Sequence, residues 1–407
     1  MSALVRVRRE GSGTHELIHL DNGVVRVVAA PGLGGRVLSV RHRDQEHLYR
    51  NDRLLGEDLR PVEGVSLGPV DGPMSAWNNV GGDKTWPAPQ GWDGPGQWAG
   101  PPDPVLDSGA YRVRVEDGPG GSVVLTLTSE DDPRTGLRLS RRLTMEPGAA
   151  GYRLDLEAVN ASTTDRRWAL WNVTQIDGAR SSDGATDGVF VGVRGEGPHT
   201  VPLVSGNGRP RVVEHVPSVL RVPSQEVVGK VGFPTASGWL ANVGAAGTLT
   251  QRFDVTEGAD YPDAGSVAEV WLETPLSRPL EHLGGLCPVD RVIEVEALGP
   301  LTELAPGQRV SLAVDFGFGS GREPVSEVTA DGFWSERPRW EGHGPGTARL
   351  VGSFTSTRHG ALVHRRSGRT LARTVPGEPT RFTVPVPEAD PRTDPDPDPD
   401  VVFAARP

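Results

Sequence analysis

Tryptophans, amides and charged side chains are concentrated between Trp77 and Trp98, and these residue types suit recognition of a hydroxyl-rich ligand. Four of the ten tryptophans fall in this segment. An indole face packs against C–H groups, while amides and carboxylates hydrogen-bond to hydroxyls. The intervening glycines and prolines predict a long irregular loop, with neither a helix nor a regular strand. The candidate binding residues here are Asn79, Asp83, Lys84, Trp86 and Gln90.

A second aromatic and amide cluster follows at residues 168–175. It adds Trp168, Trp171, Asn172 and Gln175 as candidate binding residues. We expect the two clusters to line one cleft that binds a carbohydrate or polyol. The alternative is that the indoles plug the open end of a β-sandwich, while the amides cap loop backbone.

Two predicted strands each place a pair of glutamates on one face. Alternation puts Glu269 and Glu273 on the same side of one strand, and Glu294 and Glu296 on the same side of another. A carboxyl group in a desolvated cleft lined by indoles has a raised pKa and can act as an acid, so such a pair can transfer protons without histidine. Lys84 would bind an acidic sugar, act as an electrophile or form a surface pair with its neighbour. The candidate catalytic residues are Glu296, Glu273 and Lys84. The alternative for the glutamates is a solvent-facing position on an edge strand.

Composition favours many short strands joined by turns. Glycine (53 residues) and proline (37 residues) together make up about 22% of the 407 residues. This is well above their ordinary combined usage of roughly 12%. The pattern predicts an all-β protein with its main domain over residues 1–320. A small antiparallel β appendage is expected over 321–389, and an acidic, Pro-rich, disordered tail over 390–407.

Charge and cysteine content narrow the classes of partner. A net charge of −11 repels phosphate, so we expect neither nucleic acid nor an anionic membrane as a partner. Cys287 is the single cysteine, so an intramolecular disulfide or a thiolate metal cluster is impossible. No histidines stand at zinc-ligand spacing, and we expect neither a metal nor a cofactor. The sequence shows no signal peptide and no long apolar run, which predicts a cytoplasmic protein.

Three features, taken in chain order, resemble the galactose mutarotase-like (aldose 1-epimerase-like) superfamily, whose fold is a large antiparallel β-sandwich. The opening segment 22–39 is similar to the family's first hairpin with its Gly-Gly turn. Residues 168–172 resemble the family's His-x-Tyr-Phe-Asn segment. Glu294 and Glu296 ahead of Leu304-Ala-Pro-Gly307 resemble the family's glutamate strand and its Leu-x-Pro-Gly turn. Within the superfamily, the Gly-Gly-Asp-Lys-x-Trp-Pro-Ala-Pro-Gln loop at residues 81–90 is similar to an uncharacterised group.

The resemblance implies that Glu296 stands at the position of the family's catalytic base, but the family's histidines are missing. Alignment on Asn172 puts Trp168 at the position of the acid histidine, and Val80 precedes Gly81-Gly82 where the second histidine would stand. An indole cannot supply the proton that ring opening needs. The sequence therefore argues against standard mutarotase chemistry.

Three functions remain open on the sequence alone. The first is an epimerase, isomerase or lyase that acts on a sugar or polyol through glutamate acid/base chemistry. The second is a carbohydrate-binding protein without catalysis, and the third is a structural or assembly protein that uses the appendage and tail. The ligand and the oligomeric state cannot be predicted.

Overall fold

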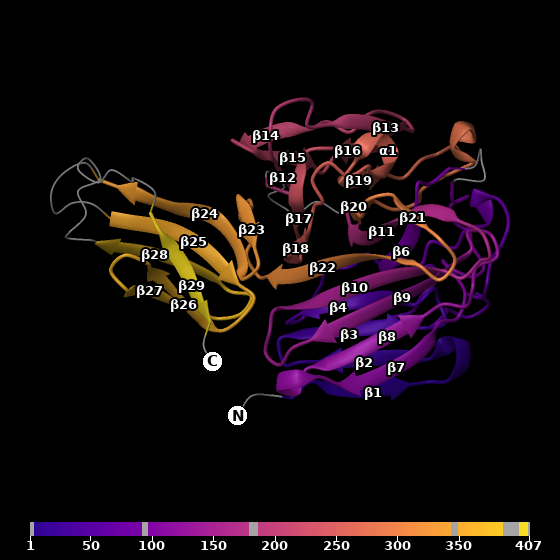
Figure 1. The fold of residues 1–407 in the computed structure, drawn as a ribbon, viewed down its shortest axis with the longest axis horizontal. Helices are drawn as coiled ribbons and strands as arrows, with labels where there is room; N and C mark the ends of the chain where they lie inside the picture. Colours follow the sequence, from indigo (N-terminus) through magenta and orange to yellow (C-terminus); the bar gives the residue numbers. More distant parts are fainter. Residues whose placement is uncertain (1–3, 92–96, 179–185, 343–348, 386–398, 406–407) are drawn as a thin grey trace.

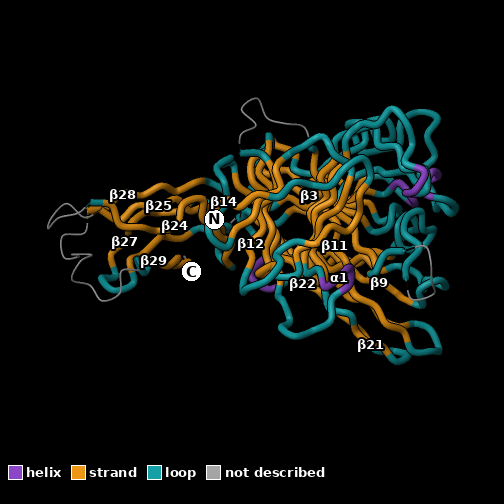
Figure 2. The backbone as a smooth tube through the Cα atoms, turned by 90° about the horizontal axis from the view of Figure 1, so that it is seen from above, coloured by secondary structure: helices purple, strands orange, loops and turns teal. Residues whose placement is uncertain are grey.

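Two large antiparallel sheets face each other across the main core in the computed structural model, and two small sheets lie to one side of them (Figure 1). The structure describes residues 4–91, 97–178, 186–342, 349–385 and 399–405. Seen from above, the small sheets extend away from the large pair (Figure 2). The predicted all-β sandwich with a small C-terminal β appendage is confirmed.

The first sheet has 12 strands and carries the candidate site. Its order is β1-β2-β3-β4-β6-β11-β20-β19-β16-β13, with β5 paired to β4 and β21 paired to β11. The strands are β1 (Arg6–Glu10), β2 (Leu17–Asp21), β3 (Val25–Ala30), β4 (Arg36–His42), β5 (Gln45–Glu46), β6 (Asp83–Ala88), β11 (Arg166–Asp177), β13 (Val201–Ser205), β16 (Gly229–Phe233), β19 (Ala268–Glu273), β20 (Val292–Leu298) and β21 (Thr302–Leu304).

The second sheet has ten strands in the order β14-β15-β12-β17-β18-β22-β10-β9-β8-β7. The strands are β7 (Arg112–Asp117), β8 (Val123–Thr128), β9 (Leu137–Met145), β10 (Gly151–Asn160), β12 (Gly188–Val193), β14 (Val213–Val216), β15 (Val219–Pro223), β17 (Ala236–Gly244), β18 (Gly247–Phe253) and β22 (Arg309–Gly319). Five short helical turns are described, at Gly13–His15, Met74–Ala76, Pro119–Gly121, Glu281–Leu283 and α1 (Pro262–Gly265).

The main core lies between the inner faces of the two large sheets. Strand β9 alternates buried and more exposed residues along its length, as expected when one face of a strand packs inward. Leu154 and Leu156 of β10 and Val295 and Ala297 of β20 are each at most 1% exposed and belong to one apolar cluster. Alternation therefore turns Glu294 and Glu296 to the outer face of the first sheet.

The appendage consists of two sheets. One has the order β23-β24-β25-β28 and the other β27-β26-β29. The strands are β23 (Glu327–Thr329), β24 (Gly332–Glu341), β25 (Arg349–Ser356), β26 (Gly360–His364), β27 (Arg369–Thr374), β28 (Pro379–Pro385) and β29 (Val401–Ala405). Val328 and Phe333 pack against Phe190 and Trp239 of the second sheet, which joins the appendage to the sandwich.

Two expectations need correction. Residues 401–405 form strand β29, which pairs with β26 from Ala405↔Gly360 to Val401↔His364, because the apolar run Val401-Val-Phe-Ala-Ala405 adds an edge to that sheet. Residues 390–398 and 406–407 of the expected tail, and residues 386–389 of the expected appendage, lie outside the described residues. Likewise, the segment 77–98 contains strand β6, whose register with β11 runs from Ala88↔Ala169 to Asp83↔Thr174. On its other side, β6 pairs with β4 at Asp83 only. At Pro87 no second strand is paired with β6, so the missing proline N–H breaks no hydrogen bond there.

Candidate functional site

Strand β6 divides its side chains between the core and the candidate site. Asp83 points between the sheets, where it accepts hydrogen bonds from Asn172 Nδ2 at 2.8 Å and Thr174 Oγ1 at 2.6 Å and pairs with Arg141 of β9. Lys84, next along the strand, lies on the opposite face. The glycine pair before β6 lets the backbone approach its neighbours, since a Cβ on Gly82 would lie 2.3 Å from the Val37 carbonyl oxygen.

The outward residues of five adjacent strands, β6, β11, β20, β19 and β16, meet in rows across the first sheet. The register pairs are Trp86↔Trp171, Gln175↔Glu294, Trp271↔Glu294, Glu269↔Glu296 and Lys230↔Trp271. Paired residues point to the same face of a sheet. The sheet thus gathers aromatic, acidic and basic side chains from distant parts of the sequence.

A pocket of about 260 Å³ lies over these rows. Its lining combines indole rings and aliphatic side chains with one lysine and three carboxyl groups. The lining residues are Met74, Trp77, Trp86, Gln90, Pro101, Trp171, Leu203, Val204, Lys230, Asp263, Trp271, Glu273, Leu283, Leu286 and Glu294. A mainly apolar pocket with a few placed polar groups is the usual form of a small-molecule site.

Lys84 lies beneath the pocket and holds Glu294 in place. Its Nζ is 3.1 Å from Glu294 Oε1, and Gln175 Nε2 donates to the same oxygen at 2.7 Å. The Lys84 ammonium also lies over the rings of Trp86 and Trp77, at 4.7 and 5.6 Å from their centroids. Burial lowers the pKa of Lys84, against the opposing effect of Glu294. Glu294 thus has one oxygen fully engaged.

Lys230 forms a second charged group with two glutamates. Its Nζ lies 2.6 Å from Glu269 Oε2 and 2.8 Å from Glu296 Oε2, and Trp171 Nε1 donates to the latter oxygen at 2.6 Å. Burial alone lowers the pKa of Lys230, but its two carboxylate partners outweigh burial and raise that pKa. Burial raises the pKa of both glutamates. Both are 0% exposed, so they lie behind the pocket wall and contact it through Lys230 and Trp171.

Glu273 is the lining carboxyl group with the clearest proton-transfer potential. Its Oε1 accepts a hydrogen bond from Trp271 Nε1 at 3.0 Å. Burial, and after it the charge of Glu294, raises the pKa of Glu273 to about 7. A carboxyl group with such a pKa is populated in both protonation states near neutral pH, which is what a general acid or base requires.

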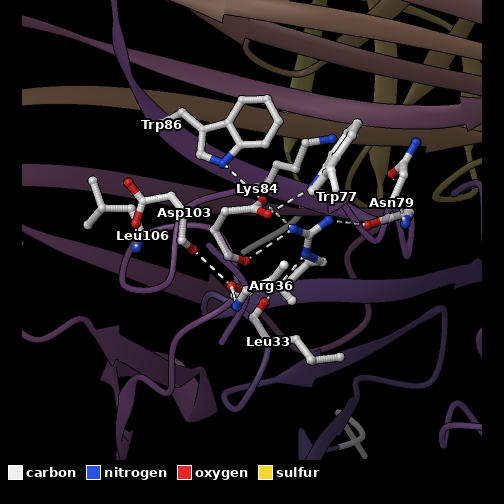
Figure 3. Close-up of polar contacts among 12 residues, drawn as sticks. Leu33, Arg36, Trp77, Asn79, Lys84, Trp86, Asp103 and Leu106 are labelled. Carbon is white, nitrogen blue, oxygen red and sulfur yellow. Dashed lines mark hydrogen bonds and ion pairs between the residues drawn. The ribbon is translucent and has the colours of Figure 1, made fainter. Parts of the chain in front are cut away.

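Asp107 orients the two indoles that lie beside Lys84. Figure 3 shows these indoles, Trp77 and Trp86, on either side of the Lys84 side chain. Trp77 Nε1 donates to its Oδ2 at 2.9 Å and Trp86 Nε1 to its Oδ1 at 3.2 Å. Arg36 pairs with Asp107 at 2.7 Å and also donates to the Gly81 carbonyl at 2.8 Å, which ties the glycine turn to the same anchor. The indole rings are therefore fixed by charged hydrogen bonds as well as by packing.

The structure brings most, but not all, of the predicted site residues together. Those that line the pocket are Trp86, Gln90, Trp171, Glu273 and Glu294. Those directly behind it are Lys84, Gln175, Glu269 and Glu296. Those placed elsewhere are Asn79, Asp83, Trp168 and Asn172.

The four residues outside the pocket correct the expectation of a single cleft. Trp168 is buried and donates from Nε1 to the Thr135 carbonyl at 3.2 Å, and Asn172 bonds to Asp83 between the sheets. The reason is alternation, because residues three apart on a strand, such as Trp168 and Trp171, face opposite sides. Asn79 Oδ1 accepts the Gly81 N–H at 3.3 Å and serves the turn.

Sequence reasoning missed several residues of the site. Lys230 is flanked by apolar residues and glycine in a short strand. A lysine in such a run indicates a buried, paired charge, and this is the signal that could have found it. Nothing in the sequence around Asp107 or Arg36 marks either residue, because the two partners are 71 residues apart in the chain. Asp263 sits on α1 with a left-handed φ of 50°, where burial raises its pKa; nothing in the sequence predicts that turn.

Within the described part of the chain, no group of three or more His, Cys, Asp or Glu side chains is arranged to hold a metal ion. None of the helices among the described residues has the length and apolarity that crossing a membrane requires.

Fold and pocket together define an all-β sandwich protein with a tryptophan-lined, charged pocket on the outer face of one sheet. The chain belongs to the family described as "Domain of unknown function (DUF4380)", whose model matches residues 16–314. A search of curated proteins finds no match.

Among solved structures, the chain is similar to a TPR-domain containing protein from Parabacteroides distasonis, at 14% identity and a TM-score of 0.48; the match covers 74% of this chain and 46% of that one. It is also similar to galactose mutarotase-like proteins from Lactobacillus casei (13%, TM-score 0.44, 74% and 99% covered) and Clostridium acetobutylicum (10%, TM-score 0.40, 77% and 98% covered). At these identities the similarities carry no residue roles.

Proposed function

We propose that this protein binds a sugar or sugar-like polyol in the pocket over Trp171 and Trp271 and transfers protons to and from it through Glu273 and Glu294. The observation that carries the proposal is the convergence of indole rings with two carboxyl groups in one pocket of about 260 Å³. This volume lies below the roughly 300–1,000 Å³ of sites for drug-sized ligands, which suits a ligand of monosaccharide size.

The indoles supply apolar faces for a sugar ring. Trp77 and Trp271 are partly exposed and line the pocket. The negative face of an indole attracts the weakly positive C–H groups on one side of a pyranose. Lys84 lies over the rings of Trp86 and Trp77, and Lys230 lies over the ring of Trp171, which leaves Trp271 as the better stacking surface.

Glu273 and Glu294, two of the three lining carboxyl groups, differ in their environments, and that difference supports acid/base chemistry. Glu294 is held by an ammonium and an amide, whereas Glu273 has an indole N–H and a pKa of about 7. Two carboxyl groups in unlike surroundings can act as a base and an acid on one ligand. In such a step one group, as a carboxylate, removes a proton from a ligand hydroxyl or activated C–H group, and the other, as a protonated carboxyl group, donates its proton elsewhere on the ligand.

Glu296 has a different role in this proposal from the one that the family resemblance implies. It lies behind the wall, and its Oε2 is taken by Lys230 and Trp171. We assign it to positioning these two side chains, with the proton transfers carried out by Glu273 and Glu294.

The test follows a panel of hexoses, pentoses, polyols and glycosides by proton NMR with the full chain, Glu273→Gln and Trp271→Ala. Wild type is expected to convert at least one panel member, and Glu273→Gln is expected to lower kcat by roughly 10²–10⁴-fold while binding is kept. Trp271→Ala should weaken binding, whereas Trp340→Ala, a partly exposed indole on β24 of the appendage, should not.

A second candidate is a carbohydrate-binding protein without catalysis. It is favoured by the full engagement of Glu296 and Lys84 in internal contacts. Binding by wild type that is lost in Trp271→Ala, with no conversion of any bound panel member, would support this candidate over the enzyme. Absence of binding across the panel would refute both.

A further inference from the structure

Carboxyl groups outnumber basic groups around the pocket. Two lysines, Lys84 and Lys230, face five carboxyl groups, and each lysine is already paired inside the protein. The five carboxyl groups are those of Asp263, Glu269, Glu273, Glu294 and Glu296. Arg36 does not alter this balance, because it is paired with Asp107 on the other side of the indoles.

Two lining carboxyl groups each keep one oxygen free for a ligand. Glu294 is 8% exposed, and both of its hydrogen bonds fall on Oε1. Glu273 accepts from Trp271 through Oε1 alone. Among the described residues no hydrogen-bond donor contacts Oε2 of either side chain. Two carboxyl oxygens on largely buried groups therefore remain for a donor from outside the protein.

We propose that the pocket selects a sugar or polyol that carries a protonated amine, with the ammonium bound between Glu273 and Glu294. This inference rests on the proposed function and names the chemical class of its ligand. An ammonium offers several N–H donors to carboxylate oxygens, and hydrogen bonds between charged groups are stronger than those of a neutral hydroxyl. It also neutralises charge that burial makes costly.

Other ligand charges fit less well. A carboxylate or phosphate on the ligand would approach three lining acids, and the cation nearest to it, Lys230, lies between Glu269 and Glu296. A neutral sugar can donate hydroxyls to the same oxygens but brings no positive charge to the two carboxyl groups. Burial and Glu294 raise the pKa of Glu273, which is the expected response of a site that lacks a cation.

The experiment is calorimetric titration of the full chain at pH 6.5 with matched ligands. The probes are glucosamine, glucose and glucuronate, and the same three substituents on the galactose ring. We expect the amine to bind about tenfold more tightly than the neutral sugar, the ratio expected when a charged hydrogen bond replaces a neutral one. The acid should bind most weakly.

Two site variants and one control make the test specific. Glu294→Gln and Glu273→Gln should each reduce the amine preference to about threefold or less, and either one suffices if the other fails to fold by circular dichroism. Glu116→Gln, on the exposed β7 strand, should keep the full preference. An amine preference that survives in a folded Glu294→Gln and a folded Glu273→Gln would overturn the proposed ammonium position.

The outcomes separate this inference from the function on which it rests. Equal or tighter binding of the neutral sugars would overturn the amine inference and leave the sugar site intact. Tightest binding of the acids would also overturn it. If cyclohexylamine, which has no hydroxyls, binds as tightly as the amino sugars, the selection for positive charge is upheld and the sugar assignment fails.

Discussion

Lys230→Met tests the electrostatic account of the pocket wall. The substitution keeps the aliphatic stem against Trp171 and removes the ammonium that serves Glu269 and Glu296, whose backbones are paired in register. Both glutamates are 0% exposed. Removal of one partner from a buried ion pair typically costs about 3–5 kcal/mol.

The loss of unfolding free energy in Lys230→Met follows from proton binding. The folded variant can restore its charge balance by protonating one additional glutamate. This costs about 1.36 kcal/mol for each pH unit between the ordinary carboxyl pKa and the pH of the solution. With that pKa at 4.5, the loss of unfolding free energy is about 4 kcal/mol at pH 7.5 and about 0.7 kcal/mol at pH 5.0. The sign follows because the folded variant binds more protons than the unfolded chain, so its stability rises as the pH falls.

Urea denaturation followed by tryptophan fluorescence at the two pH values measures these differences. The double variant Lys230→Met/Glu269→Gln removes one positive and one negative charge together, and it should recover most of the stability at pH 7.5. A loss below about 1 kcal/mol at pH 7.5, or a loss of the same size at both pH values, would refute the reasoning.

Three further predictions follow from the contacts of the site. Glu273→Gln should be more stable than wild type by about 1–3 kcal/mol at pH 8 and equal to it at pH 4. The reason is that the pKa of Glu273 is raised to about 7 in the folded protein, so the wild type loses stability as the pH rises through that value. Thermal midpoints across this pH range check the prediction, and a difference that stays constant with pH would contradict it. Asp107→Ala should cost about 3–5 kcal/mol in urea denaturation by stranding Arg36 and should weaken sugar binding, whereas Asp107→Asn, which keeps an acceptor oxygen, should bind better than Asp107→Ala; equal binding by the two would remove the orienting role. Arg141→Met should destabilise by about 3–5 kcal/mol because it leaves Asp83 buried without its cation, and a variant of wild-type stability would show that the pair does not hold the sheets together.

Alternation was the sequence signal that predicted the site best. The spacing of Glu269, Trp271 and Glu273 correctly places all three on one face of β19, where Trp271 and Glu273 line the pocket. The same rule applied to residues 168–175 places Trp168 and Trp171 on opposite faces of one strand. The composition-based prediction of strands was also sound, since proline and glycine content reflects turn frequency across a whole domain.

Other parts of the site were beyond local reasoning. Lys230 belongs to the site because it binds two glutamates that are 39 and 66 residues away in the chain. No pattern within β16 predicts these partners. Strand β6 was missed because glycines and prolines count against a strand wherever they occur, although Pro87 sits where β6 has β11 as its one paired neighbour. Pairing partners decide such cases, and they are set by the whole fold.

The two faces of β6 carry opposite charges, and this arrangement also disfavours a misfolded strand register. Asp83 and Lys84 are adjacent, yet one anchors the second sheet through Arg141 and the other supports the pocket through Glu294. A slip of β6 by a single residue would turn each side chain to the opposite face. Arg141 would then lose its carboxylate and Lys84 would enter the core beside a guanidinium. The mis-registered state is thus penalised by like charges, and the pair of residues selects one strand register during folding.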